Sequence, residues 1–227
     1  LKKTQTTISG PAGNIELNLE LPDQPSNIAV LCHPHPLYGG SMHDGVLHVA
    51  ASALLHHNLG VVRFNFRGVG ASQGISGKTT DAEKSAQPYA PPEVGDLLAV
   101  IRWLASEHDV QAPLCAGYSF GAHVLWHALP LLRAERALMI APPTAAMSFQ
   151  HIEHSAPDRV HAVWCDDDDF VETNHFRDNP NVDCLTLDEG GHFFTGQADN
   201  LASAVVSALI GTLAANKLRH RIQHLIG

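Results

Sequence analysis

Residues 114–122 read Leu-Cys-Ala-Gly-Tyr-Ser-Phe-Gly-Ala, a sequence that predicts a buried strand, a tight turn and the start of a helix, with Ser119 at the apex. A serine in that position has strained backbone geometry, and the residues two before and two after it must be small so that strand and helix can pass closely. Gly117 and Gly121 meet this requirement. Because Gly-x-Ser-x-Gly also occurs by chance in ordinary loops, the rest of the chain must decide whether Ser119 is a nucleophile.

Strand-like and helix-like segments alternate along most of the chain. Apolar residues at every second position from Ile15 to Leu21, after a β-rich stretch and a Gly-Pro-Ala-Gly turn, predict an antiparallel hairpin. The later apolar runs are separated by helix-like stretches, which is typical of parallel strands with crossover helices. The predicted fold is α/β: a mostly parallel twisted sheet of about eight strands, with an antiparallel N-terminal hairpin and helices on both faces. The later predicted strands are 27–32, 61–66, 114–118, 137–141, 160–165 and 182–187, and a final helix begins near Leu201.

Length and composition fit a single domain spanning residues 1–227. With 44% hydrophobic and 16% charged residues, the chain can bury one α/β core, and its apolar runs are shorter than the roughly 20 residues of a membrane helix. The formal charge of −9 argues against a nucleic-acid surface, which would be basic. We therefore expect neither a membrane nor a nucleic-acid partner.

Two further features bear on compartment and organisation. No secretory leader is visible. The cysteines Cys32, Cys115, Cys165 and Cys184 are widely spaced and form no Cys-x-x-Cys pair, which suits a reducing cytoplasm. The polar segment 75–92 is predicted to be an irregular insertion, either a surface loop or a small lid. If it is a lid over Ser119, deletion of 78–90 should change substrate preference.

The residues expected to carry chemistry follow predicted strands, where ligands bind in open α/β sheets. A serine hydroxyl needs a base within hydrogen-bond reach, and the base needs a carboxylate to fix its tautomer. His192 follows the last strand and is the expected base, and Asp168 follows the preceding strand and is the expected acid. Asp166 is the second choice, because residues 166–169 are four consecutive aspartates and strand alternation allows either face.

A developing oxyanion requires two N–H donors. One should be the N–H of Phe120, directly after the nucleophile, and the other should come from the turn after the first parallel strand. Residues 33–37 of that turn read His-Pro-His-Pro-Leu, and its prolines have no N–H. We expect the backbone N–H of His35 to donate, with that of Leu37 as the alternative.

Four motifs in this order resemble the α/β-hydrolase superfamily. They are Leu-Cys-His-Pro-His-Pro-Leu-Tyr-Gly-Gly-Ser-Met at 31–42, Val-Arg-Phe-Asn-Phe-Arg-Gly-Val-Gly-Ala-Ser-Gln-Gly at 62–74, Gly-Tyr-Ser-Phe-Gly at 117–121 and Gly-His-Phe-Phe at 191–194. More narrowly, the chain is similar to small bacterial serine hydrolases and carboxylesterases without a large cap, related to dienelactone hydrolase-like and X-prolyl peptidase-like proteins.

The resemblance implies roles for the residues that match these motifs. Ser119 would be the nucleophile, His192 the base and Asp168 the acid, with an oxyanion hole near His35 and Phe120. One departure concerns the acid turn, where Cys165 stands at a position that is usually glycine in the family.

Two other patterns suggest a cofactor or a metal but fit poorly. Gly68-Val69-Gly70 follows a strand, yet the third glycine is Gly74 and the stretch leads into a loop, so it lacks the helix N-terminus that holds a pyrophosphate. The histidines between residues 33 and 57 have neither His-Glu-x-x-His spacing nor a paired-cysteine partner. We predict no cofactor and no metal.

These observations predict a serine esterase that cleaves small carboxylic esters through an acyl-enzyme, with thioesters as a related substrate class. A small-peptide or amide hydrolase is the second interpretation, and it requires a site for a free amine or a proline ring. A non-catalytic binding protein of the same fold is the third, although binding alone gains nothing from this set of three residues. The expected partner is a small-molecule ester, and the expected oligomeric state is a monomer or homodimer. The last helix carries an apolar stripe predicted to pack on the sheet: Val205, Val206, Leu209 and Leu213.

Overall fold

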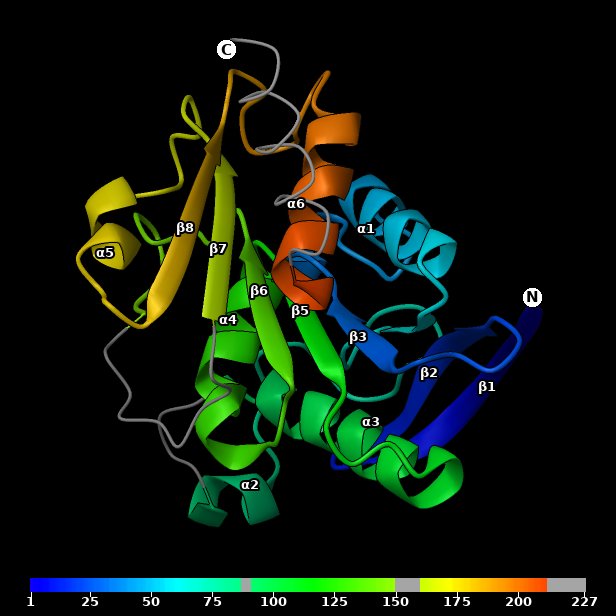
Figure 1. Cartoon of the computed structure of the whole chain (residues 1–227). Coiled ribbons are helices and arrows are strands. Elements are labelled where there is room, and N and C mark those ends of the chain that lie inside the picture. Colours follow the sequence, from blue (N-terminus) through cyan, green and yellow to red (C-terminus); the bar gives the residue numbers. More distant parts are fainter. Residues whose placement is uncertain (87–90, 150–159, 212–227) are drawn as a thin grey trace, which may run out of the picture.

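A computed structural model describes residues 1–86, 91–149 and 160–211, and an eight-stranded sheet lies at its centre (Figure 1). The strand order is β1-β2-β4-β3-β5-β6-β7-β8. β1 pairs antiparallel with β2, and β2 with β4, while every later pairing is parallel. The predicted α/β sheet with its antiparallel N-terminal hairpin is confirmed. The strands are β1 (Lys2–Gly10), β2 (Gly13–Leu21), β3 (Ile28–Cys32), β4 (Gly60–Phe64), β5 (Leu114–Tyr118), β6 (Arg136–Ile140), β7 (Val160–Cys165) and β8 (Val182–Leu187).

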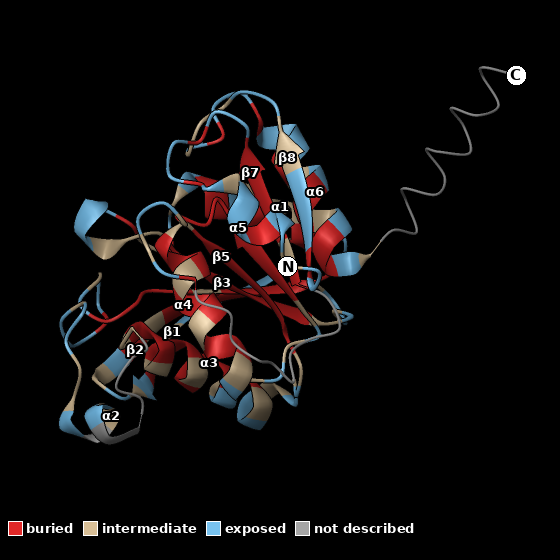
Figure 2. Cartoon of the chain, turned by 90° about the vertical axis from the view of Figure 1, so that its left-hand side faces the viewer, coloured by how far each residue is buried: buried red, intermediate tan, exposed pale blue. Residues whose placement is uncertain are grey.

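Helices cover both faces of the sheet, as the alternation of the strand side chains requires. Val30 of β3 packs in the core shared with α3 and α4, whereas its neighbour Leu31 packs in the core shared with α1 and α6. The central strands are buried, and the exposed residues lie on the outer sides of the helices (Figure 2). The helices are α1 (Gly45–His56), α2 (Asp81–Ala86), α3 (Glu93–His108), α4 (Phe120–Ala128), α5 (Thr173–Arg177) and α6 (Ala198–Ile210), with short 3-10 turns η1 (Pro36–Tyr38) and η2 (Leu129–Leu131).

The ends of several elements differ from the predicted ones by one to three residues. β4 ends at Phe64 rather than at residue 66, because the Phe66 N–H donates to the His33 side chain, at 3.0 Å, and not to a neighbouring strand. α6 begins at Ala198, slightly before the predicted start. Of its predicted apolar stripe, Val205 and Leu209 are buried against the sheet, Val206 is only half-buried, and Leu213 lies outside the described residues.

The segment 75–92 is not wholly irregular, and the prediction is wrong for Asp81–Ala86, which form α2. The Thr80 N–H donates to Glu83 Oε2 at 2.8 Å, and the Glu83 N–H donates to Thr80 Oγ1 at 3.4 Å. This pair is a capping box, in which two side chains satisfy N–H groups that the first helical turn leaves unpaired. The Thr-x-x-Glu spacing was therefore a visible helix signal. Residues 87–90 lie outside the described residues.

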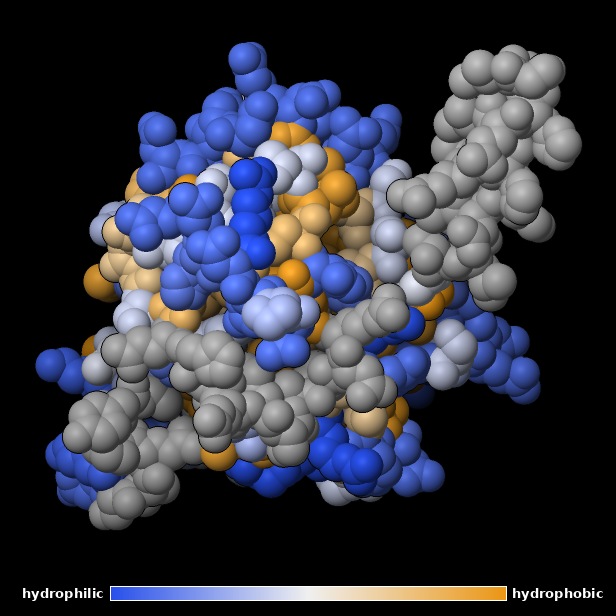
Figure 3. All heavy atoms as spheres, turned by 60° about the vertical axis from the view of Figure 1, so that its left-hand side comes forward, coloured by the Kyte–Doolittle hydropathy of each residue, from blue (hydrophilic) through white to orange (hydrophobic). Residues whose placement is uncertain are grey.

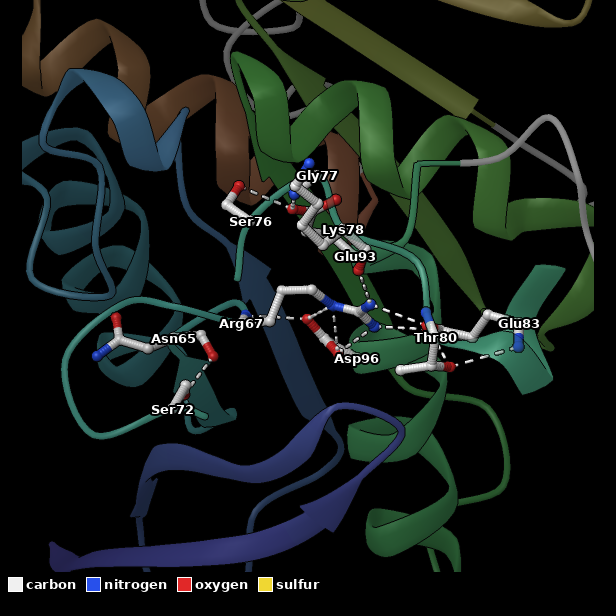
Figure 4. A network of polar contacts seen from close by, with 10 residues as sticks. All are labelled: Asn65, Arg67, Ser72, Ser76, Gly77, Lys78, Thr80, Glu83, Glu93 and Asp96. Atoms are coloured by element: carbon white, nitrogen blue, oxygen red, sulfur yellow. Dashed lines mark hydrogen bonds and ion pairs between the residues drawn. The ribbon is translucent and has the colours of Figure 1, made fainter. Parts of the chain in front are cut away.

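A buried arginine binds this segment to the body of the protein (Figure 4). Arg67 follows β4, and its side chain is fully buried. Its Nη2 donates to Asp96 Oδ1 of α3 at 2.7 Å and to Glu83 Oε1 of α2 at 2.6 Å, and its Nη1 donates to the Lys78 carbonyl at 3.0 Å. A buried cation is tolerated here because two carboxylates neutralise it and its N–H groups are hydrogen-bonded.

A second contact fixes the chain beside the arginine. Glu93, buried at the start of α3, accepts hydrogen bonds through Oε1 from Ser76 Oγ and from the Gly77 N–H, both at 2.8 Å. Figure 4 places these residues next to the Arg67 network. The first half of the segment 75–92 is therefore attached to α3 at two points.

The surface on the side of α5 and β8 is mixed, with apolar areas interrupted by hydrophilic residues (Figure 3). β8 contributes to this surface, since Leu185 is an exposed large hydrophobic residue. Among the helices that the structure describes, none is long and apolar enough to cross a membrane.

The buried network predicts that two single aspartate substitutions lower the stability of the protein by different amounts. Asp96→Asn should lower the free energy of unfolding by about 3 kcal/mol, the cost of breaking a buried ion pair while Glu83 still neutralises part of the charge. Asp81→Asn removes an exposed pair with Lys84 at 2.8 Å and should cost less than about 1 kcal/mol. Urea denaturation of both variants measures the difference, and equal losses would contradict a stabilising role for the buried network.

Candidate active site

Ser119 lies between β5 and α4 with a φ of 54° and a ψ of −118°. This backbone conformation is unfavourable for a residue with a side chain and persists only where surrounding contacts impose it. Here the Ser119 N–H donates to the Ile140 carbonyl of β6 at 2.8 Å, and the Ser119 carbonyl accepts from the Ala122 N–H at 2.9 Å. Both peptide groups of the turn are thus fixed, and the hydroxyl is held at the carboxyl edge of the sheet.

The two glycines of the turn permit contacts that no side chain could make. A Cβ on Gly117 would lie 2.2 Å from the Gly121 carbonyl oxygen, and a Cβ on Gly121 would lie 2.2 Å from the Cys32 carbonyl oxygen. Both distances are far shorter than van der Waals contact. Gly121 therefore allows α4 to start directly against the end of β3, as the sequence pattern predicts.

The predicted base and acid lie in line with the serine. His192 Nε2 is 2.8 Å from Ser119 Oγ, and His192 Nδ1 is 2.8 Å from Asp168 Oδ2. The Asp168 side chain is fully buried and that of His192 is 12% exposed. A carboxylate at Nδ1 keeps the proton on that nitrogen, so Nε2 is free to accept a proton from the serine hydroxyl.

The acid turn after β7 selects one of the four aspartates for this contact. The Asp168 N–H donates to the Cys165 carbonyl at 3.2 Å, which turns the chain back, and Asp168 Oδ1 accepts from the Phe170 N–H at 3.0 Å. Asp166, the second choice from sequence, is exposed. The geometry favours Asp168 over Asp166 as partner of His192, whereas the catalytic role stays a prediction.

His33 attaches the turn after β3 to the neighbouring strand. It is fully buried, and burial lowers its pKa to about 4, so the ring is neutral at pH 7. Its Nε2 accepts from the Phe66 N–H at 3.0 Å, so its Nδ1 carries the proton and donates to the Pro34 carbonyl at 2.7 Å. This histidine is a structural residue of the turn.

The two predicted oxyanion donors come from neighbouring residues. The His35 ring packs on the Phe120 ring with centroids 4.6 Å apart. Phe120 is the first residue of α4, so its N–H has no partner within the helix. The Leu37 N–H is already engaged, because it donates to His35 Nδ1 at 3.1 Å. This contact makes the His35 N–H a better candidate than the Leu37 N–H.

Three residues that sequence analysis did not assign also shape the site. Besides His33, these are Tyr118, whose hydroxyl donates to the His192 carbonyl at 2.9 Å, and Asp167, whose Oδ1 accepts from the Gly190 and Gly191 N–H groups at 2.9 and 2.7 Å. Burial raises the pKa of Tyr118 well above its usual value, so it remains a hydrogen-bond donor. No local signal predicts these contacts, since each joins residues far apart in the chain.

Among the described residues, the histidines near the site do not form a metal centre. Within residues 1–86, 91–149 and 160–211, no three His, Cys, Asp or Glu side chains are grouped so that they could hold a metal ion. The prediction that the protein uses neither metal nor cofactor stays a prediction.

A strained serine between a parallel strand and a helix, at the carboxyl edge of a mostly parallel sheet, defines the α/β-hydrolase class of proteins. A serine hydrolase without a lid from Xanthomonas campestris is 29% identical, with a TM-score of 0.78 over 91% of this chain and 93% of that one. An α/β serine hydrolase homologue from Coxiella burnetii is 30% identical, with a TM-score of 0.74 over 91% of this chain and 97% of that one. The chain belongs to the α/β serine hydrolases of the α/β-hydrolase superfamily.

The chain also has a similar curated relative. An uncharacterized protein from Rickettsia prowazekii is 29% identical over 234 residues, which cover 95% of this chain and 92% of that protein. No family model matches the chain. Its membership therefore rests on relatives that match over nearly the whole length.

The close backbone contact at Gly121 predicts a severe effect of one methyl group. Gly121→Ala should lower the free energy of unfolding by about 3 kcal/mol, the upper part of the range for overpacking, because the methyl group would meet carbonyl oxygens rather than a side chain that can move. Gly45→Ala at the start of α1 is the matched control, since nothing lies within 4 Å of the added Cβ. Thermal or urea unfolding compares the two, and a Gly121→Ala protein as stable as the control would contradict this packing.

Proposed function

We propose that the protein is a serine esterase that cleaves small carboxylic esters through an acyl-enzyme, with Ser119, His192 and Asp168 as its catalytic triad. The observation that carries the proposal is the continuous line of hydrogen bonds from Asp168 Oδ2 through His192 to Ser119 Oγ, both of 2.8 Å. Nucleophile and base are within the distance that proton transfer needs, and the base is oriented by a buried carboxylate.

In the first half of the reaction, Ser119 Oγ attacks the ester carbonyl carbon while its proton passes to His192 Nε2. The carbonyl oxygen becomes an oxyanion, which the N–H groups of His35 and Phe120 would hold. The intermediate then collapses: the bond to the alkoxy group breaks, and that group leaves as an alcohol with the proton from His192. Asp168 stabilises the imidazolium between these two transfers.

In the second half, water replaces the alcohol. His192 Nε2 takes a proton from the water molecule, whose oxygen attacks the acyl carbon of the Ser119 ester. The bond to Ser119 Oγ breaks, the oxygen recovers its proton from His192, and the carboxylic acid leaves. Thioesters can follow the same steps, because only the leaving atom changes.

The surface around the serine favours apolar substrate groups. Three large aromatic residues, here called the apolar rim, are exposed beside the site: Tyr38 at 90%, Phe170 at 50% and Phe193 at 74%. The Tyr38 ring contacts the ring of His35 at 5.3 Å, while Phe170 and Phe193 contact the ring of His192 at 4.8 and 5.8 Å. Single exposed aromatics need no explanation, but a group of them around one nucleophile indicates a binding surface.

We further infer that the site works without a closing lid. The first half of the segment 75–92 is attached to α3 through Arg67 and Glu93. The relative from Xanthomonas campestris is itself described as a serine hydrolase without a lid. A fixed segment suits small esters that bind to an open surface.

The proposed nucleophile is tested by Ser119→Ala. Hydrolysis of p-nitrophenyl acetate should fall by roughly 10⁶-fold, and thus to the background rate, because the acyl-enzyme can no longer form. Ser207→Ala, at an exposed position of α6, is the control and should keep wild-type activity. A fluorophosphonate probe should label wild type and Ser207→Ala but not Ser119→Ala. Turnover by Ser119→Ala would refute the mechanism, and a wild-type protein that neither reacts with the probe nor turns over esters would favour a binding protein.

The apolar rim predicts a dependence on acyl chain length. Tyr38→Ser and Phe193→Ser should each lower the ratio of kcat/KM for p-nitrophenyl hexanoate over acetate by about tenfold, the equivalent of about two buried CH₂ groups. Because the chemistry is the same for both esters, the ratio reports binding of the longer acyl chain. Leu185→Ser, at an exposed apolar position of β8, is the matched control. A ratio unchanged in both rim variants would show that the rim does not contact the acyl chain.

A further inference from the structure

The loop that carries His192 begins with two glycines, Gly190 and Gly191. Gly191 has a φ of 59°, and nothing lies within 4 Å of a Cβ built on it. Adjacent glycines lose more conformational freedom on ordering than other residues do. A base placed directly after them therefore needs backbone contacts that fix the loop.

One carboxylate oxygen supplies two of these contacts. Asp167 Oδ1 accepts the N–H of Gly190 at 2.9 Å and the N–H of Gly191 at 2.7 Å. These bonds to a charged acceptor are stronger than bonds between neutral groups. They lower the pKa of Asp167, so its carboxyl group is ionised at neutral pH.

Consecutive residues of the acid turn thus contact the same loop in different ways. Asp168 turns inward, and its buried carboxylate bonds to the imidazole of His192. Asp167 is exposed, and its carboxylate bonds to the two peptide N–H groups before that histidine. One carboxylate orients the ring and the other holds the backbone from which the ring extends.

We propose that Asp167 is a positioning residue for His192: by accepting both glycine N–H groups it holds the base loop in the one conformation that places Nε2 against Ser119 Oγ. The proposal rests on the proposed function, since it assigns Asp167 a part in the reaction of the same site. Asp167 touches neither the serine nor the imidazole, so it acts through the loop.

The neighbouring aspartates provide a matched control. Asp169 is exposed like Asp167 and carries the same charge, but its side chain makes no hydrogen bond or ion pair within the part of the chain that the structure describes. Removing its charge should leave the loop unchanged. A general effect of negative charge near the site would instead appear in both positions.

The test measures kcat and KM for p-nitrophenyl acetate in Asp167→Ala, Asp167→Asn and Asp169→Ala. Asp167→Ala should lower kcat by about 10- to 100-fold, the effect of an ångström-scale misplacement of a catalytic group, with KM changed less than about threefold. Asp167→Asn keeps an acceptor oxygen in the same place and should recover most of the lost kcat. Asp169→Ala should match wild type. A merely structural role would lower the free energy of unfolding without this division between kcat and KM.

Several results would overturn the proposal while leaving the proposed function intact. If Ser119→Ala is inactive but Asp167→Ala and Asp169→Ala are alike, positioning by Asp167 is wrong. The same holds if Asp167→Asn is as impaired as Asp167→Ala, because then charge rather than the hydrogen-bond acceptor matters. If Ser119→Ala remains active, the proposed function itself fails.

A second measurement needs no variant and covers the case in which Asp167→Ala does not fold. Amide hydrogen exchange in the wild-type protein should be slowed at Gly190 and Gly191 by at least about tenfold relative to their unstructured rates, because both N–H groups are hydrogen-bonded. Exchange of both amides at the unstructured rate would overturn the proposal.

Discussion

The site depends on one close approach of backbone to backbone, where Gly121 of α4 lies against the carbonyl groups that end β3. Any side chain at this position would push the helix away from the strand. The same approach puts the first N–H of α4 beside the turn that follows β3, where the His35 and Phe120 rings meet. This packing contact therefore brings the two proposed oxyanion donors, the N–H groups of His35 and Phe120, to neighbouring positions.

Residues that follow β4 hold the turn after β3. The Phe66 N–H bonds to the His33 ring, and the N–H of the next residue, Arg67, bonds to Asp96 Oδ2 at 2.9 Å. Two consecutive peptide groups thus connect the turn after β3 with the start of α3. Because the Arg67 side chain also binds Glu83 of α2, the chain from the end of β4 to Glu83 supports this turn.

The acid turn illustrates how neighbouring residues of a short polar run can make different contacts. Four consecutive aspartates look equivalent in sequence, but a tight turn directs neighbouring side chains to different sides. Asp168 is buried against His192, whereas Asp167 is exposed and still bonds to the loop backbone, and Asp166 and Asp169 are exposed. Burial determines the difference, because a carboxylate removed from water must be paired to remain charged.

The sequence by itself determined the α/β sheet, the antiparallel hairpin, and the nucleophile turn, because hydrophobic periodicity and the spacing of Gly117, Ser119 and Gly121 are local properties of the chain. It also indicated His192 and favoured Asp168, since both follow strands whose carboxyl ends share one edge. The helix α2 carried a local signal in its capping box that sequence analysis overlooked.

Only the tertiary structure decided which contacts fix these residues. The bonds from Asp167 to the glycines, from Tyr118 to the His192 carbonyl and from His33 to the Phe66 N–H join segments 23 to 74 residues apart. Such pairs depend on the order of strands in the sheet and on the direction of each turn. Neither is encoded in the residues near the contact, so the supporting contacts of the site appear only when the chain is folded.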